Sequence, residues 1–236
     1  MTRIAGADGC PGGWIVALRD TEGGPIQLRR VSELREVLET SDAPAVLCVD
    51  IPIGLLDEAV PGGRECDRDA REFLGPARSC SVFSPPVRAV LETTSYPTAC
   101  ATNRASSPHE LAISQQCYRI VAKIREVDEL MTPELQHRVR EVHPEVCFAE
   151  LNGGRGVESS KHEPDGRHER LELLEQAFGT ELASLVAARG KSCNVDDVLD
   201  ALAACWTAQR VLSGAAERFP AEPPRDSRGL RMEIVR

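Results

Sequence analysis

Residues 45–54, Ala-Val-Leu-Cys-Val-Asp-Ile-Pro-Ile-Gly, are the stretch from which the fold class of this 236-residue chain is inferred. The run from 45 to 49 is continuously apolar, which is typical of a central strand buried on both faces of a sheet. Asp50 follows it directly. The carboxyl end of such a strand is a favoured ligand site in layered α/β folds, although an aspartate near Pro52 can also cap a turn. We favour a functional Asp50, because the sequence continues apolar and a charge is conspicuous there.

Three further strands are expected before this run, at residues 3–8, 14–18 and 26–31. Residues 9–13, Gly-Cys-Pro-Gly-Gly, are dense in turn formers and predict a hairpin between the first two strands. Ser32 is a suitable N-cap for a helix over 32–39. The expected order is therefore three hairpin-linked strands, a helix, and then the buried strand that ends in Asp50.

The rest of the chain is expected to be mainly helical. Residues 55–131 are interpreted as an inserted cap over the sheet, within a single domain that shows no internal repeat. The pattern predicts helices at 66–74 and 114–130, a loop at 79–86, a strand at 140–148 broken at Pro144, and a flexible loop at 153–166. It also predicts helices at 168–178, 180–188 and 196–212, a turn at 226–229 and a short strand at 231–235.

Composition narrows the class of protein. The net charge of −9 counts against non-specific coating of nucleic acid, and aromatic residues make up only 4% of the chain, so stacking platforms for bases would be scarce. The nine cysteines include no Cys-x-x-Cys pair, so neither a disulfide framework nor a zinc site is expected. We expect a cytoplasmic protein without a membrane partner, since there is neither a secretory signal nor a long apolar span.

The acidic residues suggest a metal site. Asp8 lies where the first strand meets a Gly-rich turn, and Asp197 and Asp200 lie at the start of a late helix. Carboxylates bind hard cations such as Mg²⁺, and two ions roughly 3.5–4 Å apart can clamp a phosphodiester. Each acid also has an ordinary explanation, because Asp8 can bond its own turn. Asp197 suits a first helical turn that Asn194 caps, which leaves Asp200 in the second turn less well explained.

Two other polar clusters are candidates for the chemistry. Glu141, His143 and Glu145 would share one face of a strand, where they offer ligands or a general base, unless that face is simply exposed. Arg64 and Arg71 share a helical face with Asp67, where they would bind phosphate or form surface ion pairs. Lys161 and Arg170 flank the flexible loop and could reach an anion.

These residues resemble the domain-of-unknown-function 429 family, whose members are described as predicted nucleases with an RNase H-like fold. The matching stretches run through nearly the whole chain: 6–14, 50–54, Arg64 with Asp67 and Arg71, 81–83, 123–128, 141–145, Lys161 with Gly166 and Arg170, and 196–201. The resemblance implies a mixed five-stranded sheet flanked by helices. It also implies metal-binding acids on the first strand, the fourth strand and the last helix, the places of Asp8, Asp50 and Asp197 or Asp200.

The sequence thus predicts a nuclease-like hydrolase that uses Mg²⁺ or Mn²⁺ and acts on nucleic acid or a nucleotide. Its expected residues are the metal ligands Asp8, Asp50, Asp197 and Asp200, the proton-transfer candidates Glu141, His143 and Glu145, and the phosphate contacts Arg64, Arg71, Lys123 and Lys161. One alternative is a phosphotransferase of the actin and hexokinase type, and another is a non-catalytic protein that binds a small anionic ligand. Assembly as a homodimer is left open.

Overall fold

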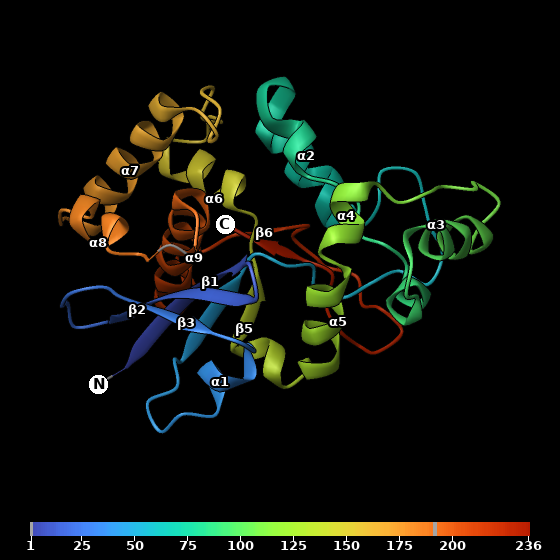
Figure 1. Ribbon diagram of the computed structural model, residues 1–236, viewed down its shortest axis with the longest axis horizontal. Coiled ribbons are helices and arrows are strands. Elements are labelled where there is room, and N and C mark those ends of the chain that lie inside the picture. Colours follow the sequence, from blue (N-terminus) through green and yellow to red (C-terminus); the bar gives the residue numbers. More distant parts are fainter. Residues whose placement is uncertain (1, 191–192) are drawn as a thin grey trace.

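A computed structural model describes residues 2–190 and 193–236 of the chain. Its centre is a five-stranded sheet in the order β3-β2-β1-β4-β5 (Figure 1). The strands β1, β2 and β3 are antiparallel neighbours, whereas β4 and β5 run parallel to β1. This is the strand order of the RNase H-like fold, so the predicted fold class is confirmed. The bounds are β1 Arg3–Cys10, β2 Gly13–Asp20, β3 Gln27–Val31, β4 Val46–Val49 and β5 Val139–Glu141.

The β1–β2 turn depends on glycine. Gly12 has a φ of +73° and Gly13 a φ of +155°, both in a region that L side chains rarely adopt. A Cβ at Gly13 would also lie 2.1 Å from the carbonyl oxygen of Val31 on β3. The hairpin therefore closes tightly only with glycine at these positions, and this brings β3 alongside β2.

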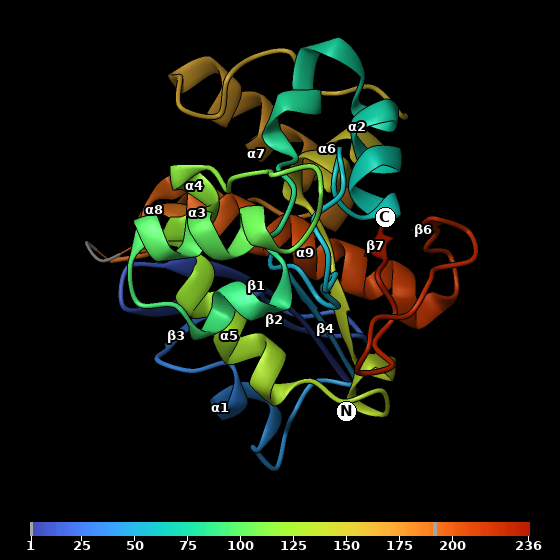
Figure 2. The same cartoon turned by 90° about the vertical axis from the view of Figure 1, so that its right-hand side faces the viewer.

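Period-two alternation divides β1 between two cores. Ile4 and Cys10 face the long helix α9 (Val195–Ser213), whereas Ala5 and Ala7 face the opposite side of the sheet. Helices α6 (Pro144–Leu151), α7 (Pro164–Phe178) and α8 (Ala183–Ala187) pack around α9. The other face is covered by α1 (Arg35–Leu38) and α5 (Val121–Leu130), as Figures 1 and 2 show.

The connection from β4 to β5 contains the whole region expected as a cap, 55–131. Its elements are α2 (Glu65–Arg78), η1 (Ser79–Ser81), η2 (Arg88–Glu92), α3 (Tyr96–Ala105), α4 (Gln115–Arg119), α5 and η3 (Leu135–His137). The single helix expected over 114–130 is in fact two, because Ile120 leaves helical geometry at φ −105° and ψ 3°. In Figure 2 the short helices α3 and α4 lie in front of the edge of the sheet.

The strand predicted at 140–148 is present only at its start, and the prediction that it continues to 148 is wrong. β5 ends at Glu141, and α6 begins at Pro144. Proline has no amide hydrogen, and the first helical turn needs none there, so Pro144 starts a helix instead of interrupting a strand. The same reasoning explains why α7 begins at Pro164, ahead of the predicted 168.

Smaller differences concern the ends of the chain. The turn expected at 226–229 is present, with the amide of Gly229 donating to the carbonyl of Asp226 at 2.9 Å. The expected strand at 231–235 is shorter, as β7 (Ile234–Val235), and it pairs with an unpredicted β6 (Arg218–Phe219).

The nine cysteines are free thiols, and Cys80 is the exposed one. No helix among the described residues is long and apolar enough to cross a membrane.

Candidate functional site

Topology brings Asp8 and Asp50 to the same edge of the sheet. Ala7 on β1 and Val49 on β4 are partners in the parallel ladder, and the amide of Asp50 donates to the carbonyl of Ala7 at 3.0 Å. The residues that follow this pair are therefore Asp8 on β1 and Asp50 directly after β4. Asp8 shares its face of β1 with Ile4 and Cys10, so its side chain points toward α9.

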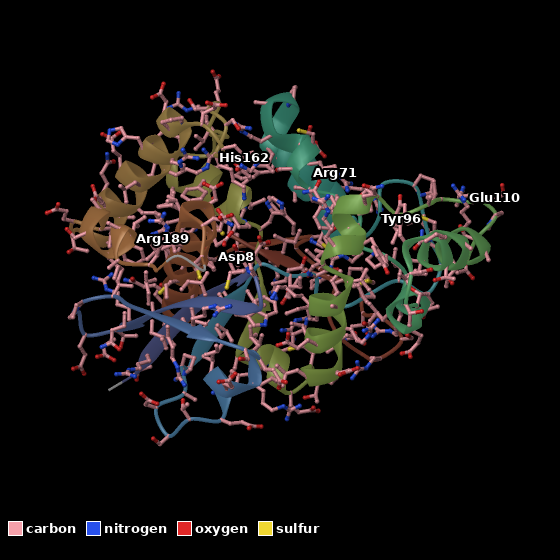
Figure 3. The ribbon with its side chains drawn as sticks, in the orientation of Figure 1. Asp8, Arg71, Tyr96, Glu110, His162 and Arg189 are labelled. Carbon is pink, nitrogen blue, oxygen red and sulfur yellow. The ribbon has the colours of Figure 1, made fainter. Side chains whose placement is uncertain are left out.

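Helix α9 supplies the third carboxylate. It lies so close to β1 that a Cβ on Gly6 would be 2.3 Å from the carbonyl oxygen of Ala201. Asp200 precedes Ala201 and is only 3% exposed, while Asp8 is 9% exposed. Asp8, Asp50 and Asp200 line one cavity of about 700 Å³. Figure 3 shows Asp8 near the middle of the molecule.

The three carboxylates disturb one another's protonation. Burial, and then the charges of Asp50 and Asp200, raise the pKa of Asp8 well above its ordinary value. Burial and Asp200 raise the pKa of Asp50 to about 8, although Lys161 and a hydrogen bond with Asp8 oppose this. Burial also raises the pKa of Asp200, against the attraction of Lys161. Like charges gathered in a buried place hold protons in this way unless a cation compensates them.

Lys161 is the one cationic side chain in direct contact with this carboxylate cluster among the described residues. Its Nζ donates to Oδ2 of Asp200 at 2.6 Å. Burial lowers the pKa of Lys161, but the attraction of Asp200, Asp50 and Asp8 outweighs it and raises that pKa above its ordinary value. Lys161 therefore stays charged in the site.

The loop that carries Lys161 is held on both sides. Arg170 is fully buried and donates to the carbonyl of Ser159 at 3.0 Å, and its Nη2 donates to both carboxylate oxygens of Glu145, at 2.9 and 2.8 Å. Arg78 donates to the carbonyls of Val157 and Glu158. Glu145 was a candidate for proton transfer, and its bond to Arg170 instead makes it an anchor of this loop.

Asp197 lines the larger cavity but has a different task. It is the third residue of α9, and its Oδ2 accepts from the amide of Asn194 at 2.9 Å, in a reciprocal capping box. The N-cap expected at Asn194 is therefore confirmed. Asp200 thus lies with Asp8 and Asp50, whereas Asp197 holds the helix end and acts on Asp8 through its charge, which helps to raise the pKa of Asp8.

Arg64 and Glu141 form a buried pair rather than a reactive one. Arg64 donates to Glu141 at 2.5 and 2.8 Å and to Asp67 at 2.7 Å. It also donates to the carbonyls of Ile53 and Gly54, both at 3.1 Å. The Arg64 side chain is 2% exposed, so the phosphate contact expected of it is corrected: its donors are already occupied. Glu141 likewise accepts from Arg64 and from the amide of Ile53 at 2.6 Å, and is not free as a base.

His143 is the N-cap residue of α6 and differs from Glu141 and Glu145, because no arginine donates to it among the described residues. It lines a second cavity, of about 380 Å³, together with Asp8, Asp50 and Lys161. Its Nε2 lies 3.3 Å from the carbonyl oxygen of Ser81, which can only accept, so Nε2 carries the hydrogen. Nδ1 is then a buried acceptor without a protein partner among the described residues. Burial lowers the pKa of His143 to about 4, so the ring is neutral near pH 7.

The two remaining phosphate candidates are placed differently. Arg71 on α2 donates to the carbonyls of Val82 and Gly62 at 2.7 and 2.6 Å and to Ser84 at 3.1 Å, which ties down the neighbouring loop. It lies away from the lining of both cavities, to the upper right of Asp8 in Figure 3. Lys123 on α5 lies at the wall of the smaller cavity, where Nζ donates to the carbonyl of Gly13 and sits 4.3 Å from the Trp14 ring centroid.

The sequence did not point to Arg78 or Gln116, although both line the smaller cavity. Arg78 is the last residue of α2, and a basic residue at a helix C-terminus has an ordinary explanation in the helix dipole. No local signal distinguishes it, because its role comes from a loop far along the chain.

The model for a family described as "Protein of unknown function (DUF429)" matches residues 6–225. The chain belongs to the DUF429 family. No curated protein and no solved structure matched the chain in the corresponding comparisons. The stretch matched by the DUF429 model contains all of the site residues described above.

The donor chemistry of this DUF429 site suits a hard divalent cation. Three ionised carboxylates and the charged Lys161 would together carry two negative charges, which one Mg²⁺ or Mn²⁺ would balance. A cation would also displace the protons that the raised pKa values retain. Within residues 2–190 and 193–236, no group of three or more His, Cys, Asp or Glu side chains is already arranged to hold a metal ion. Binding would therefore require the carboxylates to adjust around the ion.

Proposed function

We propose that this DUF429 protein is a divalent-metal-dependent hydrolase of phosphodiester bonds in nucleotides or nucleic acid. One observation carries the proposal: Asp8, Asp50 and Asp200 come from two strands and a helix and meet at one cavity with raised pKa values. Functional sites are where burial and like charges shift pKa values in this way. The RNase H-like strand order supports the same interpretation, although a fold alone does not determine an activity.

In this proposal the chain's own residues have distinct roles. Asp8, Asp50 and Asp200 would hold Mg²⁺ or Mn²⁺, which would supply charge stabilisation at the phosphoryl oxygens and a more acidic water. The lone pair of His143 Nδ1 accepts a proton from the attacking water, since its Nε2 hydrogen is committed to Ser81. The neutral form of His143 at pH 7 is the form that such a base requires. Lys123 stands at the cavity wall as a contact for the phosphate.

The walls of the site favour a nucleotide or a single-stranded end over an intact duplex. Asp8 and Asp200 are 9% and 3% exposed, at the bottom of a cleft rather than on an open face. Gln116 and Lys123 form one wall, and Lys161 and His162 contribute to the other. The net charge of −9 adds to this argument, because a duplex-binding surface relies on many cationic contacts.

The test is hydrolysis of a substrate panel by the wild type and Asp50→Asn, with Mg²⁺ and with Mn²⁺. The panel contains a nucleotide diester, single-stranded DNA, single-stranded RNA and duplex DNA. Asparagine is nearly isosteric and removes one of the repelling charges, so the fold should be retained while turnover falls by about 10²-fold or more. Glu58→Gln changes an exposed acid away from both cavities and is the matched control. Equal turnover in wild type and Asp50→Asn would remove the catalytic proposal.

A second candidate, a non-catalytic protein that binds a small ligand, is favoured by one specific contact. Lys161 already neutralises Asp200 at 2.6 Å, as a charge pair in a binding site would. One measurement distinguishes the two candidate functions. The binding protein would take up Mn²⁺ or a small anion and lose this uptake in Asp50→Asn, while no substrate in the panel turned over with either variant.

A further inference from the structure

The contact between Lys161 and the carboxylates leads to an inference beyond the proposed function. Its Nζ lies 2.6 Å from Oδ2 of Asp200, whose side chain is 4% exposed, while the Lys161 side chain itself is 31% exposed. Lys161 thus enters the cluster from the solvent side and ends against its most buried member. Asp50 and Asp8 also attract its charge.

This position is built by buried contacts rather than left to a free surface side chain. The carbonyl of Ser159, two residues before Lys161, accepts from the buried Arg170, and Glu145 holds Arg170 through both of its oxygens. On the other side, Gly166 lies so close to the loop that a Cβ there would be 2.0 Å from the carbonyl oxygen of Ser160. The backbone that presents Lys161 is therefore fixed from two directions.

The charge of the cluster limits how many ions it can take. When a cation has displaced their protons, the three ionised carboxylates and the charged Lys161 leave two negative charges, enough to balance one divalent cation. A second divalent ion beside the charged Lys161 would leave about two excess positive charges in a buried place, which is costly, whereas removal of Lys161 would halve that excess. Asp197, the next acid on α9, is committed to the helix cap.

We propose that the Lys161 ammonium group takes the place of a second metal ion, so that the site holds one divalent cation and not two. This inference rests on the proposed function, because it concerns the same carboxylates. Asp200 would then have two cationic partners, Lys161, which donates to its Oδ2, and the ion. The ammonium group supplies positive charge beside the reacting phosphate, and this charge is present at any metal concentration.

The test counts Mn²⁺ ions bound at saturation by isothermal titration calorimetry and by electron paramagnetic resonance. The wild type should bind one Mn²⁺ with the spectrum of an isolated ion. Lys161→Ala should bind two, and their spectrum should show spin coupling, because paired ions in such sites lie about 3.5–4 Å apart. Lys161→Arg keeps the charge and should bind one. Arg155→Ala removes an exposed cation from the same loop and should behave as the wild type.

The possible outcomes distinguish a failure of this inference from a failure of the proposed function. Two ions in the wild type, or one ion in both the wild type and Lys161→Ala, would overturn the role of Lys161 and leave the hydrolase proposal standing. No Mn²⁺ uptake by the wild type would overturn the metal-dependent function itself, and the inference with it. If Lys161→Ala does not fold, Lys161→Met retains most of the aliphatic stem without the charge, and the same ion count decides.

Discussion

The close approach of α9 to β1 at Gly6 can be tested by a single methyl group. A Cβ at this position would lie 2.0 Å from the amide nitrogen of Cys205 and 2.3 Å from the carbonyl oxygen of Ala201. Both atoms belong to helix backbone, so no side chain can turn away to make room. Gly6→Ala therefore requires the whole helix to withdraw from the sheet, by roughly 1 Å or more to restore ordinary contact distances.

The cost follows from the size of the interface that must open. Overpacking a core typically costs about 1–3 kcal/mol, and a gap of about 1 Å forfeits up to roughly half of the dispersion energy of the contacts it separates. Because α9 packs against β1, β2 and β4, we expect Gly6→Ala to lower the free energy of unfolding by about 3 kcal/mol or more. Asp200 moves with the helix, so Mn²⁺ affinity should fall as well.

Urea unfolding followed by circular dichroism measures this effect. With an m value of about 2–3 kcal/mol/M, a loss of 3 kcal/mol lowers the midpoint by about 1–1.5 M. Gly156→Ala is the matched control, because its Cβ would meet its nearest neighbours at an ordinary 3.4 Å. A Gly6→Ala midpoint within about 0.3 M of the wild type would refute the close helix–sheet contact, and with it the placement of Asp200.

Three further substitutions test other contacts. Arg64→Met leaves the buried carboxylates of Glu141 and Asp67 without a cation, so it should lower the free energy of unfolding in urea by about 3–5 kcal/mol. A loss below about 1 kcal/mol would contradict the buried ion pairs. The pKa of about 4 for folded His143 lies below the unfolded value of about 6.5, so His143 should contribute a loss of at most about 3 kcal/mol on acidification from pH 6.5 to 4. Above pH 6.5 both states are neutral, and below it the unfolded chain takes up the proton first; His143→Gln should therefore lose less stability over this range, and parallel profiles would contradict the assignment. Gly166→Ala should displace Ser160 and the adjacent Lys161, so it should gain a second Mn²⁺ as Lys161→Ala does, and an unchanged ion count would contradict the anchoring of the loop.

Local pattern predicted the elements near the sheet because their signals are short-range. The apolar run at 45–49 became β4, and the Gly-rich turn at 9–13 became the β1–β2 hairpin. The capping residue Asn194 marked the start of α9. The pattern misled at Pro144, because proline interrupts a strand but also begins a helix, and only the packing of the residues after it decides between the two.

The roles of the charged residues were harder to predict, because a charge reveals its role only through its partners. Arg64, Glu141 and Glu145 were expected to act on substrate, yet their partners lie far along the chain and occupy them. Lys161 was expected to bind an anion of the substrate, and the structure places it against the acids of the chain itself.

The amino-acid sequence by itself determined the family, the order of the first four strands along the chain and the acids at the strand ends, because alternation, turn chemistry and motif spacing are properties of neighbouring residues. Only the tertiary structure decided that Asp200 meets Asp8 and Asp50, that Asp197 caps the helix at the rim of the same cavity, and that Lys161 joins the cluster. The reason is physical: the packing of α9 on Gly6 sets which turn of the helix faces the sheet edge. The loop that carries Lys161 is positioned by buried contacts between segments that no local pattern connects.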